Sequence, residues 1–203
     1  MEEKKIWYFP QSGPDNTLAT LDIALERAKE LGIKHMVVAS RSGDTALSLE
    51  KKAREVDYSG NLVMVTYHAG FCGEDSISFT PSRREELEKK GVKIVMSSHA
   101  LSGVGRSFRQ KFGGVSIPEI IAESYRRISQ GFKVAVEIAI MAADGGVIPT
   151  TDDVISMGGR GKGVDTAILL RAAHQNSFFD LKIKRNTLFT ARRKNLERRK
   201  SND

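Results

Sequence analysis

The stretch Val37-Val38-Ala39-Ser40-Arg41-Ser42-Gly43-Asp44-Thr45-Ala46 joins the end of a β-branched run to the start of a helix-like segment. The first-turn N–H groups of such a helix are unpaired and lie at the positive end of the helix dipole, so the turn favours a phosphate. Gly43 lets the backbone approach a ligand closely. We therefore expect a phosphate site formed by Ser40, Ser42, Gly43, Thr45 and the backbone N–H of Asp44.

A second interpretation of the same stretch is an ordinary strand-to-helix turn in which Ser42 or Asp44 is the N-cap of the helix. The Asp44 carboxylate also argues against a phosphate, because it would repel a dianion unless it points away from the site. The local pattern leaves both interpretations open.

Strand-like and helix-like segments alternate regularly around this turn. Short β-branched or apolar runs predict strands over residues 5–9, 35–39, 62–66 and 93–97. Apolar residues at helical spacing predict helices over residues 16–31 and 44–56, and Thr80-Pro81 opens a third helix that ends at Gly91. This alternation with short connections predicts a three-layer α/β sandwich, a mostly parallel sheet with helices on both faces.

The pattern changes after Gly113-Gly114. Residues 117–130 predict one helix, and residues 132–143 predict a second helix so apolar that we expect it to be buried, although it would also serve an interface between copies of the chain. Residues 153–157 and 166–172 predict two strands, joined by Gly158-Gly159-Arg160-Gly161-Lys162-Gly163. This glycine-rich turn fits either a hairpin or a basic flap over a ligand.

Small and polar residues follow the predicted strands at their carboxyl ends, where parallel sheets bind ligands. His68 and His99 each follow a strand, and on neighbouring strands they would face one crevice, which suits ligand binding or proton transfer. Residues 102–107 fit either a glycine-rich loop that closes over an anion with Arg106 as donor, or a plain connecting loop. We expect the groove leading away from the phosphate to be lined by Tyr67, His68, Ser98, His99, Ser102, Gly103 and Arg106. With only two histidines there, we expect no metal.

The net charge of +7 is unevenly placed along the 203 residues. Nine Lys or Arg residues and one acid lie between Lys182 and Lys200, which gives +8 there and leaves about −1 for the rest. We expect a single α/β domain over residues 1–184 and a basic, partly disordered C-terminal extension over residues 185–203. The neutral body argues against a nucleic-acid-binding domain, and the basic extension leaves a nucleic-acid contact as an alternative.

Cysteine usage and hydropathy bear on the compartment. The single cysteine, Cys72, excludes an internal disulfide and favours a reducing cytoplasm. No apolar stretch reaches the roughly 18 residues that a membrane span needs, so we expect no membrane contact. The N-terminus, residues 1–5, lacks the apolar region of a signal peptide.

The turn from Ser40 to Thr45, between a strand and a helix, resembles the phosphate-binding turn in the C-terminal domain of pyruvate kinase. The chain is similar to a family of stand-alone archaeal and bacterial proteins with that α/β domain. The similarity covers nearly the whole chain to about Lys184, and further matching stretches are residues 26–33, 98–103, 111–114, 131–137 and 178–184.

The resemblance implies the fold of the pyruvate kinase C-terminal domain, with a phosphate site at residues 40–45. It does not imply pyruvate kinase catalysis, because that chemistry belongs to a barrel domain of roughly 250 residues and its metal-binding carboxylates. The residues also present no complete catalytic constellation, so whether the chain is an enzyme stays open.

Two function hypotheses follow. The first is binding of a phosphorylated small molecule, and flavin mononucleotide (FMN) is favoured over a sugar phosphate because aromatic residues lie beside the polar loops. The second is an enzyme that uses this ligand, either a flavin-dependent oxidoreductase or a sugar-phosphate enzyme with His68 or His99 as acid and base.

Overall fold

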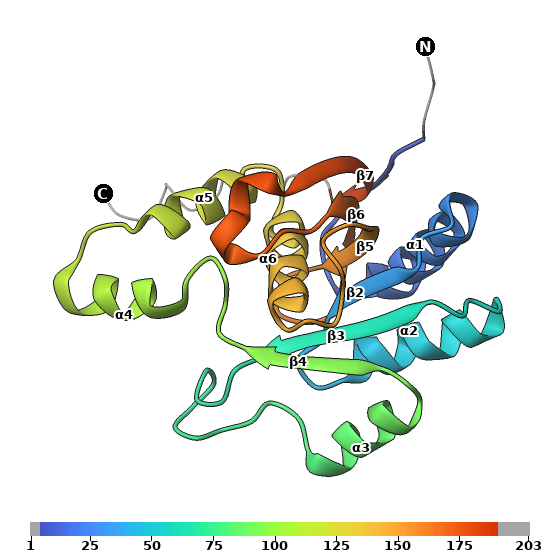
Figure 1. Cartoon of the computed structure of the whole chain (residues 1–203), viewed down its shortest axis with the longest axis horizontal. Helices are drawn as coiled ribbons and strands as arrows, with labels where there is room; N and C mark the ends of the chain where they lie inside the picture. Colours follow the sequence, from blue (N-terminus) through green and yellow to red (C-terminus); the bar gives the residue numbers. More distant parts are fainter. Residues whose placement is uncertain (1–4, 191–203) are drawn as a thin grey trace, which may run out of the picture.

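The computed structural model describes residues 5–190, without the side chains of residues 185–190. One sheet of seven strands runs through the protein in the order β1-β7-β6-β5-β2-β3-β4 (Figure 1). The strands are β1 Trp7–Phe9, β2 His35–Ala39, β3 Asn61–Tyr67, β4 Lys93–Ser97, β5 Asp153–Gly158, β6 Thr166–Arg171 and β7 Lys182–Thr190. Six α-helices and two short 3-10 helices connect them within the described residues: η1 Pro14–Asn16, α1 Thr17–Leu31, α2 Asp44–Glu55, α3 Pro81–Lys89, α4 Gly103–Phe112, α5 Ile117–Arg126, α6 Gln130–Asp144 and η2 Gln175–Asp180.

The sheet is mostly parallel, as the alternation of segments predicts. Strands β2, β3, β4 and β5 run parallel to one another, and β1 runs parallel to β7. Only β6 is antiparallel to both of its partners, β5 and β7. Because β5 pairs with β2, the glycine-rich turn after β5 lies at the same edge of the sheet as the turn after β2.

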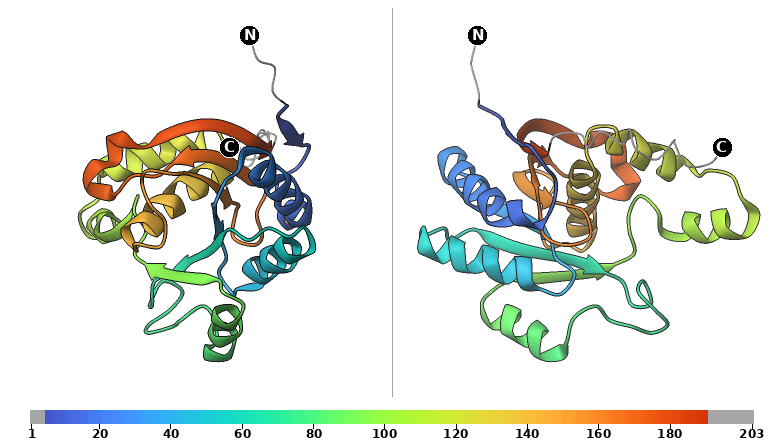
Figure 2. Two further views of the ribbon diagram at one scale, coloured as in Figure 1. Left: turned by 45° about the vertical axis from the view of Figure 1, so that its right-hand side comes forward. Right: turned by 180° about the vertical axis from the view of Figure 1, so that it is seen from behind.

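Helices cover both faces of the sheet and complete three layers (Figure 2). Side chains on alternate positions of a strand point to opposite faces, so Met36 and Val38 pack with α1, α2 and α3, while Val37 packs with α6. Helix α6 is buried along nearly its whole length. The most apolar predicted helix therefore belongs to the core, and it is not a surface for another copy of the chain.

Local sequence signals explain several of the element ends. Thr80 is the N-cap of α3, its side chain accepts a hydrogen bond from Arg83 N, and Pro81 follows in the first turn. Gly32 ends α1 in the left-handed conformation that glycine tolerates. Observed bounds differ from the expected ones by a few residues at most ends, and the helix expected over residues 117–130 ends earlier, at Arg126.

Two expectations need correction. The loop expected over residues 102–107 is wrong, because Gly103 begins α4; the apolar residues Val104, Phe108 and Phe112 recur at the spacing of one helix face. The domain end expected at residue 184 falls inside β7, which pairs with β6 and, through its last residues, with β1. The basic residues after position 190 lie outside the described part of the chain.

No helix among residues 5–190 is both long enough and apolar enough to cross a membrane.

Candidate functional site

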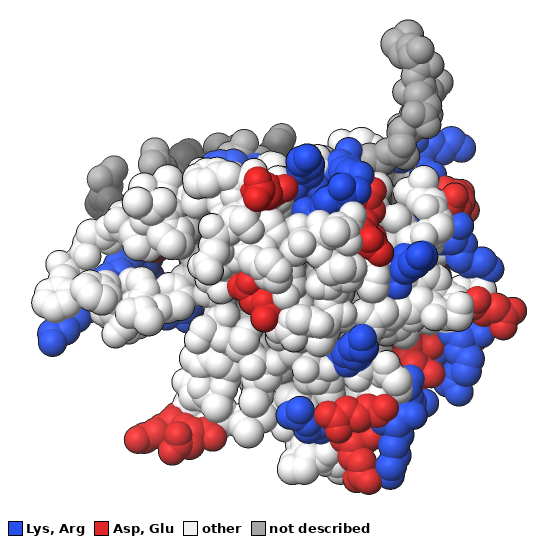
Figure 3. All heavy atoms as spheres, in the orientation of Figure 1, with Lys and Arg blue, Asp and Glu red and all other residues white. Residues whose placement is uncertain are grey.

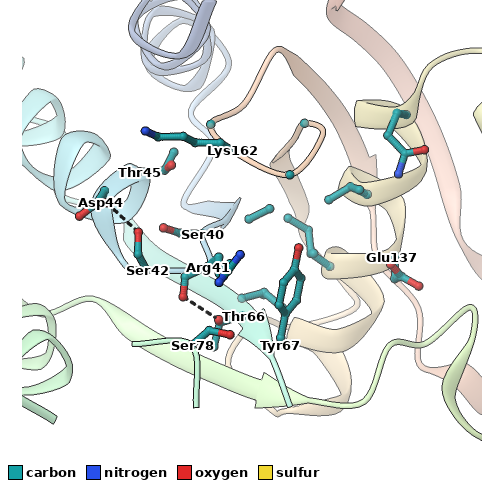
Figure 4. A pocket seen from close by; sticks show the side chains of 18 of the residues that line it. Ser40, Arg41, Ser42, Asp44, Thr45, Thr66, Tyr67, Ser78, Glu137 and Lys162 are labelled. Carbon is teal, nitrogen blue, oxygen red and sulfur yellow. Dashed lines mark hydrogen bonds between the residues drawn. The ribbon is translucent and has the colours of Figure 1, made fainter. Parts of the chain in front are cut away.

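A cavity of about 660 Å³ lies at the carboxyl ends of β2, β3 and β5. This size falls within the range of small-molecule sites. Four segments line most of the cavity: the turn at residues 40–45 (the 40–45 turn), the carboxyl end of β3 with the loop after it, the side of α6 that faces the cavity, and the turn at residues 158–163 (the glycine turn). Figure 4 shows the 40–45 turn on one side of the cavity and Glu137 of α6 on the other.

The N-terminus of α2 has no side-chain cap. Its N-cap is Gly43, which has a φ of 92°, a value that suits glycine. A Cβ at this position would lie 2.8 Å from Arg83 Cγ and 3.0 Å from Leu87 Cδ1, so any other residue would require these side chains of α3 to move. The interpretation of Ser42 or Asp44 as the N-cap is therefore wrong, because neither side chain caps the helix.

The hydroxyl group of Ser40 is the strongest indication of a bound ligand in the cavity. The residue is 5% exposed, and its Oγ is the only buried side-chain polar atom without a hydrogen-bond partner in the described part of the chain. Ser40 lines the cavity directly after β2. A buried hydroxyl without a partner costs free energy, so this position is prepared to donate to, or accept from, a bound group.

The Asp44 carboxylate is engaged by two neighbouring side chains. It accepts a hydrogen bond from Ser42 Oγ at 2.7 Å and pairs with Arg83 of α3 at 3.4 Å. In Figure 4 its carboxylate lies on the side of the turn away from Tyr67. The charge of Arg83 offsets the charge of the Asp44 carboxylate, which was the argument against a phosphate at this turn. The Ser42 hydroxyl proton is already engaged by Asp44.

The glycine turn brings a cation to the lining of the cavity. In Figure 4, Lys162 extends from the glycine turn toward Thr45. The chain after this turn is tied to the start of α1: Val164 N donates to Thr17 Oγ1 at 3.1 Å, and Asp165 Oδ2 accepts from Gly13 N at 3.1 Å. Burial raises the pKa of Asp165, and the hydrogen bonds that it accepts from the Thr166 hydroxyl and from Gly13 N oppose the shift. The turn is a hairpin, since it joins the antiparallel strands β5 and β6, and it brings Lys162 to the cavity. That it covers a ligand stays a prediction.

Aromatic rings line the cavity beyond the end of β3. The Tyr67 and Phe71 ring centroids lie 4.4 Å apart, and His99 lies 4.6 Å from Phe71. Arg106 places its guanidinium 4.7 Å from the Phe71 centroid. The rings of His68 and His99 are 6.2 Å apart because β3 and β4 are neighbours, but only His99 lines the cavity, so the two histidines do not both face it as expected.

The wall formed by α6 contains a buried ion pair. Lys133 Nζ lies 2.5 Å from Glu137 Oε2, and Glu137 Oε1 accepts from Leu101 N at 3.1 Å. Both residues line the cavity, and both are at least nine-tenths buried. Burial lowers the pKa of Lys133, and Glu137 opposes that shift. Burial also lowers the pKa of His99.

The structure brings most of the expected site residues together. Those that line the cavity are Ser40, Ser42, Asp44, Thr45, Tyr67, His99 and Arg106. Gly43 belongs to the 40–45 turn but does not line the cavity, and neither does His68, which contacts the Phe71 ring and has its Nδ1 2.7 Å from the Ala69 carbonyl oxygen. Ser98, Ser102 and Gly103 are not among the lining residues.

The expected site left out Arg126 at the end of α5 and the wall from α6, formed by Gln130, Lys133 and Glu137. The helix was interpreted as core, and its apolar character is real. The signal that distinguishes this wall is the pair Lys133 and Glu137, four residues apart on a helix that otherwise buries apolar side chains.

Comparisons with known proteins identify the family. A family model described as the alpha/beta domain of pyruvate kinase matches residues 19–170. Two solved structures of pyruvate kinase from Cryptosporidium parvum are also similar, one with 15% identity over 77% of this chain and a TM-score of 0.39, the other with 13% identity over 87% and a TM-score of 0.32. The chain covers 23% of each of those proteins.

Proposed function

Because the chain belongs to the family of the pyruvate kinase alpha/beta domain, we propose that it binds a phosphorylated small molecule in the cavity beside α2, with the phosphate at the 40–45 turn. FMN is the first candidate, and a sugar phosphate is the second. The observation that carries the proposal is the buried, unpartnered Ser40 hydroxyl beside an uncapped helix N-terminus.

The donors around the 40–45 turn suit a phosphate monoester. The first-turn N–H groups of α2 have no side-chain partner, and the helix dipole makes that end positive. Ser40 and Thr45 add hydroxyl groups, and Lys162 adds a positive charge from the opposite side. Such an arrangement of backbone N–H groups, hydroxyls and one lysine is how proteins commonly hold phosphate.

The rest of the cavity favours a ligand with a flat ring. Tyr67, Phe71 and His99 offer aromatic surface, and Val134, Ile138 and Met141 of α6 offer apolar surface. A sugar would leave this surface uncovered, whereas an isoalloxazine ring would cover it. The ring carries carbonyl acceptors on its pyrimidine side, and Lys133 and Gln130 are donors on the α6 wall.

The test compares FMN with riboflavin, which differs from FMN only in lacking the phosphate. Calorimetric titration of the full chain should show riboflavin binding about 10- to 100-fold more weakly than FMN, the loss expected for one or two hydrogen bonds to a charged group. Glucose 6-phosphate, added as competitor, should displace FMN if the two share the turn. Equal affinities for FMN and riboflavin would remove the phosphate from the proposal, and no binding of FMN or glucose 6-phosphate would overturn it.

A charge placed in the turn provides the matched variant. Ser42→Asp should weaken FMN binding at least about 10-fold, because its second carboxylate repels the phosphate. Ser59→Asp makes the same change at an exposed position ahead of β3 and should leave binding unchanged. Melting temperatures of both variants show whether the fold is retained. FMN affinity unaffected by Ser42→Asp would mean that the turn is structural only.

A further inference from the structure

Helix α4 presents an apolar stripe to the outside of the protein. None of its ten residues is buried. Val104, Phe108 and Phe112 are 60–73% exposed and follow one another four residues apart, so they lie on one side of the helix. The Phe108 and Phe112 ring centroids are 5.7 Å apart.

The stripe continues across the turn into α5. Val115, Ile117 and Ile120 are 55–75% exposed. The two helices are joined side by side: Arg109 forms an ion pair with Glu119, and Gly105 lies so close to Ser116 that a Cβ there would be 2.9 Å from Ser116 Oγ. We call these six side chains, Val104, Phe108, Phe112, Val115, Ile117 and Ile120, the apolar face. Figure 3 shows the region of α4 largely white, while acids and bases gather at the opposite end over α2 and α3.

The apolar face is large for a monomeric protein. An aromatic side chain covers 150–250 Å² when fully buried, so these six exposed side chains offer on the order of 600 Å². Monomeric proteins rarely leave a larger contiguous apolar patch in water. A stable dimer hides about 800 Å² on each partner, and the apolar face supplies most of that area.

Helix α4 gains little stabilising burial from the described part of the chain. A helix of ten residues is marginal in water, and most helices are stabilised by burying an apolar side. Within residues 5–190, α4 buries none of its side chains. Covering Val104, Phe108 and Phe112 would supply the burial that the helix lacks.

The charges at the border of the apolar face favour a second copy over a charged surface. Glu119 pairs with Arg109, and Glu123 pairs with Arg126 and Arg127, so much of the charge there is satisfied within the chain. A membrane or a nucleic acid would require an unpaired basic surface. A straight apolar stripe along a helix suits ridge-into-groove packing against an identical helix.

We propose that a second copy of this chain covers the apolar face, with α4 and α5 of one protomer packed against the same helices of its partner. The test is the molar mass of the full chain in solution, measured by sedimentation velocity from about 1 to 100 µM. We expect at least twice the mass of one chain over this range.

Phe108→Asp is the decisive variant, because it places a charge in the centre of the contact and should weaken self-association at least 100-fold. Phe112→Asp is its independent repeat. Val56→Asp, at the C-cap of α2 and outside the apolar face, is the control and should keep the oligomeric mass. Circular dichroism spectra show that each variant is folded.

Three outcomes would overturn the proposal. If the wild-type chain has the molar mass of a monomer at 100 µM, no second copy covers this face. An oligomer that survives both phenylalanine variants uses another surface. If the chain is monomeric and floats with vesicles that contain anionic lipid, the apolar face binds a membrane instead.

Discussion

His99 shows how burial adjusts a single residue. Its ring lies among Tyr67, Phe71 and His68, and Glu137, Lys133 and Arg106 are the charges that act on it. Burial dominates and lowers its pKa, so the neutral form is favoured in the folded protein. A neutral imidazole in the cavity can stack on a ring and still offer one donor and one acceptor.

This burial predicts a pH dependence of stability. The unfolded chain binds a proton at His99 near pH 6.5, whereas the folded chain binds it only at lower pH. The contribution of His99 is therefore complete above about pH 6.5 and is lost as the pH falls through the folded pKa. In urea unfolding between pH 7.5 and 5, the free energy of unfolding should fall less for His99→Gln than for the wild type.

His35 also has a pKa lowered by burial, so part of the loss remains in the variant. The difference between the two chains isolates His99. Parallel curves for wild type and variant would contradict the prediction. An NMR titration of the His99 ring gives the same answer at one atom.

Residues of the candidate site could be predicted from the sequence where a rule of local structure applied. Gly43, Ser40 and Thr45 follow from the chemistry of a strand-to-helix turn, and the structure places them beside an uncapped helix end. Lys133 and Glu137 did not follow, because an apolar helix is interpreted as core and the sequence does not show which strand ends face it. Their contact with the cavity depends on tertiary packing.

At the scale of elements, two glycines allow α6 to lie close against β5. A Cβ on Gly158 would meet the Gly131 carbonyl oxygen and lie 2.7 Å from Ala135 N, and both atoms belong to the backbone of α6. A Cβ on Gly131 would meet the side chain of Thr166 on β6. This close approach brings Lys133 and Glu137 to the cavity wall.

Gly158→Ala should therefore push α6 away from the sheet. Backbone atoms cannot rotate aside as a flexible side chain can, so we expect a loss of about 3 kcal/mol in the free energy of unfolding, at the upper end for an overpacked core. Thermal and urea unfolding measure it. Gly145→Ala is the matched control, because its Cβ would find no neighbour nearer than 3.3 Å, and its loss should be much smaller. Equal losses would show that the contact between α6 and β5 is not the cause.

Elements with a strong local period were the easiest to predict. The strands β2 and β4 occupy the expected residues, and α1 and α3 begin within a residue of the expected positions. Helix α4 was missed because Gly103 and Gly105 are poor helix formers, and glycine-rich stretches usually form loops. Its apolar residues at intervals of four were the contrary signal.

At the scale of the whole molecule, the two ends of the described chain are neighbours in the sheet. β1 pairs with β7 in register, Trp7 opposite Leu188 and Phe9 opposite Thr190. This pairing could not be predicted from sequence, because the basic charge after residue 182 suggested an extension and not a strand. Strand order depends on long-range contacts that no local period encodes.

The pairing predicts where the chain can be shortened. A chain that ends at Lys184 lacks the partner residues of β1, whereas a chain that ends at Thr190 keeps all of them. We expect the shorter chain to lose about 3 kcal/mol, which lowers the melting temperature by about 6–12 °C for a protein of this size. Differential scanning calorimetry compares the two. Equal melting temperatures would mean that β1 and the end of β7 add nothing to stability.

The order of strands in the sheet also determines when during synthesis all walls of the cavity are present. β5 inserts beside β2, so the 40–45 turn, made early, meets Lys162 only after more than a hundred further residues have left the ribosome. A nascent chain that ends before β5 lacks the glycine turn and therefore Lys162. Under the proposed function, a translation product truncated before the glycine turn would therefore bind the phosphorylated ligand more weakly than the chain that contains Lys162.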